Sequence, residues 1–367
     1  MKYFLNLLLL LFFFGKGVVS AQNINFEKRA IKTLTSKNFS GRGYVDNGMQ
    51  KAAFFLAKKF GKMKLKSFDQ NYFQEFEFPI NYIEEATLEF NHQPLLYGID
   101  YIVYPNSASH PKENATNKVK YIYDNAQKLA SLSTSQSDST TLIIDEKWKN
   151  LHHEMTKTEV KSSFNPKFRA QNIIGYLEGK EKDSLIVITA HYDHLGKVQQ
   201  VIFPGANDNA SGVGMLLGLA KHFGKQPPKH TLVFIAFAAE EAGLIGSQYF
   251  VENPLFDLNR IKMLINLDIL GTGEDGIQVV NGTIHAKELE VLQSINRENK
   301  YVPQIKTRGE ACNSDHCFFH ALGIKSFYIY TLGAKSYYHD PRDDYKSLSL
   351  DKFAEIKQLL IDFVERI

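Results

Sequence analysis

Two hydrophobic patterns alternate through the second half of the chain. Nearly continuous apolar runs are typical of strands buried on both faces, and they cover Ser184–Ala190, Thr231–Phe237, Met263–Leu267 and Ser326–Tyr330. Segments with the apolar spacing of helices cover 211–223, 241–250, 286–299 and 350–364. Strands that alternate with helices predict an α/β fold with three layers, in which helices cover both faces of a mostly parallel central sheet.

The first half of the chain has a different pattern of apolar and polar residues. Residues 46–63 repeat apolar side chains at a helical period and carry lysines on the other side. From residue 73 to residue 144, short alternating runs predict strands that are separated by loops rich in Ser, Thr and Asn. We therefore interpret 22–85 and 166–367 as two parts of one α/β domain, and 86–165 as a small β-rich insertion.

Residues 1–21 predict a secretory signal peptide. Lys2 precedes the apolar run Leu5–Phe14, and small residues follow up to Ala21, where we expect cleavage. The run is too short to span a hydrocarbon core of ~30 Å, so we expect no stable membrane insertion. A short membrane anchor is the alternative. Export to the periplasm or the medium would allow Cys312 and Cys317 to form a disulfide, although both could equally remain buried free thiols.

Composition and missing motifs argue against several classes of function. The chain has 367 residues, with 43 Lys and Arg against 40 Asp and Glu, which leaves a net charge of +3. This near-balance argues against a nucleic-acid partner. Hydrophobic residues make up 44% of the chain and aromatic residues 13%, which is enough for a large core. Neither a P-loop nor a G-x-S-x-G motif occurs, so P-loop nucleotide binding and serine hydrolysis have no residues to support them.

Ionisable residues follow three of the predicted buried strands. His191 comes after the first, Glu240 and Glu241 after the second, and Asp268 after the third. Ligands of open α/β sheets bind outside the carboxyl ends of the strands, so we expect these side chains to meet. Imidazole and carboxylate both suit zinc, and a carboxylate between two metal ions screens their repulsion. The residue types therefore predict a two-metal site.

Six short segments carry a resemblance to a known family. They are HYDHLG (191–196), GANDNASG (205–212), AAEEAGLIGS (238–247), NLDILG (266–271), SDH (314–316) and YHDPRD (338–343). Together, and in this order, they resemble the M28 zinc peptidases, which are co-catalytic aminopeptidases. SGRGY and the helix after it, at 40–62, are similar to the N-terminal element of that family. The resemblance spans about 22–80 and 166–367 and makes these parts the expected catalytic domain.

The resemblance implies a ligand set for two Zn²⁺ ions per chain. His191 and Asp268 match the ligands of one zinc ion, and Asp208 matches the carboxylate that bridges both. Glu241 and His339 match the ligands of the other zinc ion.

Two further carboxylates match catalytic positions of the family. Glu240 corresponds to the general base that deprotonates the attacking water. Asp193 corresponds to the acid that contacts His191 on the side away from the metal ion and fixes the tautomer of its ring. His194 we expect to be structural rather than a metal ligand.

The function implied by this resemblance is hydrolysis of N-terminal peptide bonds, so the expected partners are peptides with a free N-terminus. Two alternatives share the fold. One is a glutaminyl cyclase, which uses a single zinc ion to form pyroglutamate. The other is a non-catalytic, receptor-like relative. The bridging residue in GANDNASG and the pair Glu240 and Glu241 favour the peptidase.

Overall fold

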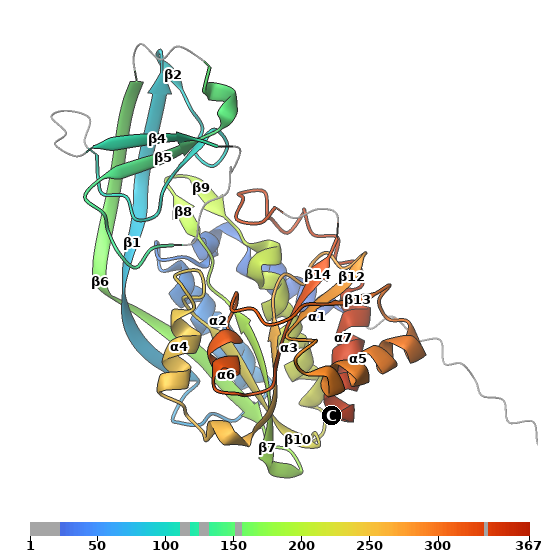
Figure 1. The fold of residues 1–367 in the computed structure, drawn as a ribbon. Coiled ribbons are helices and arrows are strands. Elements are labelled where there is room, and N and C mark those ends of the chain that lie inside the picture. The colour runs from blue at the N-terminus through green and yellow to red at the C-terminus, as the bar shows by residue number, and fades with distance from the viewer. Residues whose placement is uncertain (1–22, 111–117, 125–131, 151–155, 334–336) are drawn as a thin grey trace, which may run out of the picture.

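A computed structural model describes residues 23–110, 118–124, 132–150, 156–333 and 337–367. The predicted signal peptide, 1–21, lies outside the described residues. Figure 1 shows a central sheet covered by helices, with a small β-rich part at one end of the molecule. Both features follow the predicted α/β class.

Nine of the described strands form one large sheet, in the order β13-β12-β14-β11-β7-β10-β6-β1-β2. The strands of the structure are β1 (Phe73–Phe90), β2 (Gln93–Pro94), β3 (Tyr101–Val103), β4 (Val119–Tyr123), β5 (Thr140–Ile144), β6 (Thr156–Leu177), β7 (Glu181–His191), β8 (Gly196–Val198), β9 (Val201–Phe203), β10 (His230–Phe237), β11 (Ile261–Leu267), β12 (Gly276–Val280), β13 (Ile305–Thr307) and β14 (Ser326–Leu332). The four central strands β14, β11, β7 and β10 are parallel to their neighbours in this group. Their carboxyl ends therefore reach the same edge of the sheet, as the alternating pattern predicts.

Helices pack on both faces of this sheet. They are α1 (Asn25–Leu34), α2 (Gly48–Lys62), α3 (Gly212–Phe223), α4 (Ile245–Glu252), α5 (Ala286–Asn299), α6 (Cys317–Ala321) and α7 (Phe353–Arg366). Ile186 and Ile188 of β7 belong to the core shared with α1, α2, α3, α5 and α7. Leu185 and Val187 face the opposite core, which contains Phe250 of α4 together with α6. The alternation of side chains along β7 explains why the whole run had to be apolar.

The small β-rich part stands on two long strands of the large sheet. β1 and β6 pair antiparallel from Phe73 to Phe90, so the same strands belong to the large sheet at one end and to the small part at the other. Strands β3, β5 and β4 form a separate sheet beside this ribbon (Figure 1). The predicted borders at 86 and 165 fall inside these two strands, because a period of two cannot show where a strand leaves one sheet for another layer.

One predicted helix begins later than expected. Its pattern predicts a start at Glu241, whereas α4 begins at Ile245. Ala239 and Leu244 have positive φ angles of 58° and 63°, which no helix interior accommodates. The residues between them form a turn that keeps Glu240 and Glu241 at the strand end. Among the helices that the structure describes, none combines the length and apolar composition needed to cross a bilayer.

Candidate metal and catalytic site

Three neighbouring strands bring the predicted site residues to one edge of the sheet. His191 ends β7, while Glu240 and Glu241 follow β10 and Asp268 follows β11. All but Glu240 are buried, and Glu240 is half-buried. Because the strands are parallel neighbours, residues far apart in the chain become adjacent in space.

Asp208 lies between two histidines. Its Oδ1 atom is 3.3 Å from Nε2 of His191, and its Oδ2 atom is 3.3 Å from Nε2 of His339. Asp208 belongs to the turn Ala206–Ser211 before α3, and its peptide bond to Asn209 is cis. A single carboxylate therefore contacts two clusters of possible ligands.

The first cluster consists of His191, Asp208 and Asp268. Nε2 of His191 is 3.4 Å from Oδ1 of Asp268, and one possible ligand atom from each residue lies within 4.8 Å of the others. The buried Oδ1 of Asp268 accepts no hydrogen bond from the described residues. The other oxygen, Oδ2, accepts from the hydroxyls of Ser314 and Tyr328, each at 3.5 Å.

The second cluster contains Glu241 and two histidines. Oε2 of Glu241 is 3.1 Å from Nε2 of His339, and Oε1 is 2.7 Å from Nδ1 of His194. One ligand atom each of His194, Asp208 and Glu241 also lies within 4.8 Å of the others. The sequence predicts that His194 is structural rather than a metal ligand. The structure places its buried ring in direct contact with Glu241.

Asp193 links His191 to the turn of the two glutamates. Its Oδ1 atom is 3.8 Å from Nδ1 of His191 and accepts a hydrogen bond from the backbone of Glu240 at 3.2 Å. Its Oδ2 accepts from the backbone of Glu241 and from the hydroxyl of Tyr44, at 3.3 and 3.1 Å. Nδ1 of His191 lies closer to the backbone carbonyl of Asp193, at 3.3 Å, so residue Asp193 contacts His191 and also fixes the turn of the two glutamates.

The turn that carries Asp208 is fixed by residues from the two ends of the chain. Arg42 is fully buried and donates to the carbonyls of Pro204, Gly205 and Asp208, at 2.6, 2.7 and 3.3 Å. Burial lowers the pKa of Arg42 to about 10, which leaves the guanidinium charged at neutral pH. From the other end of the chain, Asp343 accepts hydrogen bonds from the backbone of Asn207 and Asp208.

The loop before α6 contributes a further buried acid. Cys312 and Cys317 form a disulfide around this loop, so the first of the two possibilities left open by the sequence is the observed one. Inside the loop, Asp315 is fully buried, with the side chain of Ser247 beside its carboxylate. Burial is the main reason why the pKa of Asp315 is raised to about 7.

The charges within the site perturb one another strongly. Burial alone would lower the pKa of His191, but Glu240 and Asp268 raise it well above its usual value. Burial raises the pKa of Glu240 well above the ordinary range, and Glu241 and Asp315 act in the same direction. Perturbed groups of this kind gather where a protein holds charge for chemistry or for a cation.

Comparison with known proteins supports this picture. The model of peptidase family M28 matches residues 172–364, which is more than half of the chain. This chain belongs to peptidase family M28. The resemblance seen in the six motifs is thereby confirmed, and the matched range begins inside β6 and includes all the predicted site residues.

A curated relative matches over a similar share of this chain. Aminopeptidase YwaD of Bacillus subtilis (strain 168) is 30% identical over 201 residues, which are 52% of this chain and 43% of that protein. The match therefore spans less than half of this curated relative.

Solved structures share the fold over most of their length. A zinc aminopeptidase from Bacillus subtilis superimposes with a TM-score of 0.70 at 20% identity, covering 94% of this chain and 95% of that one. A glutaminyl cyclase from Bacteroides thetaiotaomicron gives 0.59 at 16% identity, with 94% and 98% covered. At these identities the similarity establishes the fold.

The donor set of this M28 member fits zinc. Buried imidazole nitrogens and carboxylate oxygens are the ligands that zinc prefers besides thiolate. Oδ1 of Asp268, which is buried without a described hydrogen-bond donor, has the free lone pairs that a metal ion would use.

Sequence reasoning gave no role to Arg42, Tyr44 or Asp315. Arg42 and Tyr44 belong to the quoted SGRGY motif, so a signal was present, but their partners lie about 150 residues further along the chain. Asp315 belongs to the quoted SDH motif. Only its burial and its position beside the glutamates distinguish it from a surface acid.

Proposed function

We propose that this protein is an exported zinc aminopeptidase that removes residues from peptides with a free N-terminus. The observation that carries the proposal is the position of Asp208, whose two oxygens each lie 3.3 Å from a different histidine. A carboxylate placed in this way suits two metal ions better than one, because its negative charge would offset their repulsion.

Each predicted ligand has a place in this arrangement. One zinc ion would be held by His191 and Asp268, the other by Glu241 and His339, and Asp208 would be shared. The contact between His194 and Glu241 would fix the orientation of that carboxylate. Bound zinc would supply a Lewis acid that polarises the scissile carbonyl and lowers the pKa of water.

Glu240 is the residue best placed to move the proton. Its carboxylate has an oxygen within 4.8 Å of ligand atoms of His191 and Glu241, and its side chain is half-exposed to the space at the sheet edge. It would take a proton from the attacking water and return it to the leaving amine. Burial raises the pKa of Glu240 well above its ordinary value, which makes its carboxylate a stronger base and favours this role.

The site also accounts for a preference for N-terminal residues. Four carboxylates, those of Asp208, Glu240, Glu241 and Asp268, gather within one buried edge. With zinc bound, much of this negative charge would be offset by the ions. The free α-amine of the substrate would bind to a metal ion or to a nearby acid, and this anchoring would select N-terminal residues.

The test is a mass spectrum of a peptide that begins with Gln-Leu, incubated with the zinc-loaded protein with and without a chelator. Stepwise loss of N-terminal residues that the chelator abolishes would support the proposal. Loss of ammonia alone would assign the cyclase function instead, and an intact peptide would favour a binding role. Cell fractionation of the full chain tests export, since residues 1–21 should be missing from the exported form.

A further inference from the structure

A cluster of positive charge lies at the edge of the molecule opposite the site. Helix α3 begins directly after the turn of Asp208 and ends at Phe223, so its far end is ~18 Å from the site at 1.5 Å per residue. We call the positive groups around this far end the basic face. It consists of Arg29, Lys58, Lys59, Lys62, Lys221 and Lys225.

Like charges surround one another in the basic face. The pKa of Lys59 is lowered, first by burial and then by Lys62, Arg29, Lys221 and Lys58. None of the six residues forms an ion pair with a carboxylate that the structure describes. Elsewhere, exposed lysines are often paired, as Lys66 is with Glu178. The repulsion within the basic face would be relieved by an anionic partner.

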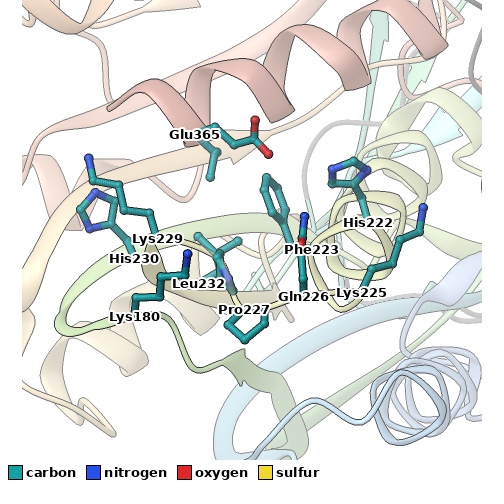
Figure 2. Close-up of a pocket in the computed structure, with 12 residues that line it drawn as sticks. Lys180, His222, Phe223, Lys225, Gln226, Pro227, Lys229, His230, Leu232 and Glu365 are labelled. Atoms are coloured by element: carbon teal, nitrogen blue, oxygen red, sulfur yellow. The ribbon is translucent and has the colours of Figure 1, made fainter.

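A hollow beside the basic face combines positive charge with apolar surface. Its volume is about 230 Å³, and Lys180, Lys225 and Lys229 line it together with the apolar side chains of Phe223 and Leu232. Figure 2 shows these residues around the hollow, with Glu365 as the acid among the described lining residues. In such a hollow the lysines can bind the anionic headgroup of a lipid, while the apolar side chains contact its hydrocarbon chain.

An aromatic side chain lies against the same surface. The ammonium groups of Lys59 and Lys221 lie 5.2 and 4.5 Å from the ring centre of Phe26, in the half-buried first turn of α1. Asn23, the first described residue, lines a neighbouring hollow with Lys221 and Lys225. The basic face and the two hollows therefore lie side by side around the far end of α3.

We propose that the basic face binds the surface of a membrane that contains anionic phospholipids. Lysines beside aromatic and apolar side chains, as found here around Phe26 and Phe223, are the composition by which proteins bind such surfaces. Because the catalytic edge of the sheet lies at the other end of α3, the site would remain open to peptides while the basic face is bound. This proposal does not depend on the enzymatic activity.

The experiment measures co-sedimentation of the full chain with vesicles of neutral phosphatidylcholine and with vesicles that also contain phosphatidylglycerol. An apolar leader would bind both kinds, so the difference between them isolates the contribution of charge. We expect stronger binding to the anionic vesicles, falling as NaCl is raised from 50 to 500 mM. Since each surface lysine contributes about fivefold, replacing Lys58, Lys59, Lys62 and Lys221 by Gln should weaken this binding at least a hundredfold.

The matched control replaces four exposed lysines of the small β-rich part, Lys118, Lys120, Lys149 and Lys157, by Gln. It changes the net charge equally and should leave anionic-vesicle binding within a few-fold of wild type. Unchanged binding in the basic-face variant, equal losses in both variants, or no preference for anionic vesicles would each overturn the proposal. Tight binding to heparin without binding to anionic vesicles would also overturn it, in favour of a soluble polyanion. Circular dichroism would verify that both variants are folded.

Discussion

Individual side chains determine which chemistry this edge of the sheet can support. Asp208 contacts two histidines from segments 148 residues apart, while the neighbouring acids Glu240 and Glu241 point to different partners. At a turn, adjacent side chains diverge, so one can bind a metal ion while the other reaches a substrate. This division of labour can be tested by changing one residue at a time.

Replacing Glu240 by Gln should lower kcat by about 10² to 10⁴-fold, because the side chain keeps its size but loses its ability to accept a proton. Zinc content, measured by inductively coupled plasma mass spectrometry, should stay at the wild-type value. The exposed acid Glu75 provides the control, and its Gln variant should turn over normally. Near-normal turnover in the Glu240 variant would show that another group is the base.

Replacing His339 by Ala should reduce bound zinc from about two ions to about one per chain, since the second cluster loses a nitrogen ligand. The measurement is metal content after dialysis against a weak chelator. His92 is exposed, and its Ala variant should retain both ions. Unchanged zinc in the His339 variant would contradict the assignment of the second site.

The arrangement of elements explains why these side chains meet. The parallel strands β7, β10 and β11 bring three segments to one edge, and the turn before α3 is held there by Arg42 from a distant segment. The small β-rich part also reaches this edge. The backbone N–H of Leu132 donates to the carbonyl of Glu241 at 2.8 Å, and its side chain packs against the cores of both parts.

Replacing Arg42 by Met should destabilise the protein by about 3 kcal/mol, because several buried carbonyls would lose a charged donor. Urea unfolding followed by circular dichroism measures this change. Arg29 is exposed, and its Met variant should unfold within about 0.5 kcal/mol of wild type. A similar midpoint for both variants would mean that water replaces the guanidinium at no cost.

Replacing Leu132 by Pro should lower kcat/KM about fivefold more than replacing it by Ala. Proline lacks the N–H that donates to Glu241, whereas alanine keeps it, and a net hydrogen bond contributes about 1 kcal/mol. Assays with one dipeptide substrate compare the two variants. Equal losses would indicate that only the apolar side chain of Leu132 contributes.

Across the entire fold, burying so many acids makes stability depend on pH. In the structure the pKa of Asp315 is about 7, against an ordinary value of 3.8, so the folded chain holds this proton more tightly than the unfolded chain. Between pH 4 and 7 the folded state therefore binds more protons, and the free energy of unfolding falls as pH rises. The contribution of Asp315 to this slope ends near pH 7.

Replacing Asp315 by Asn should remove its contribution to this slope in the metal-free protein. Relative to wild type, the variant should gain stability progressively from pH 4 to pH 7, and the gain should level off above pH 7. Thermal unfolding in the presence of a chelator, at several pH values, provides the measurement. Asn at the fully exposed Asp183 serves as the control and should follow the wild-type curve. A constant offset between the Asp315 variant and wild type would argue against a raised pKa.

The local sequence pattern was sufficient to predict the central strands, the sheet edge that carries the site and the family of this protein. The continuous apolar run at 184–190 needs only its neighbours to be recognised as a doubly covered strand, and the strand ends place His191, Glu240 and Asp268 near one edge. The chain order of the six motifs was sufficient for the family. These features are encoded over a few residues, so no knowledge of distant contacts was required.

Tertiary structure decided the features that depend on direction and distance. His194 contacts Glu241, Asp315 is buried beside the glutamates, and Leu132 donates a hydrogen bond to Glu241. Each of these contacts joins segments that no short pattern relates. The late start of α4 depends on two positive φ angles. Side-chain direction at a turn is set by packing against other parts of the chain, and for this reason these features appear only in the folded molecule.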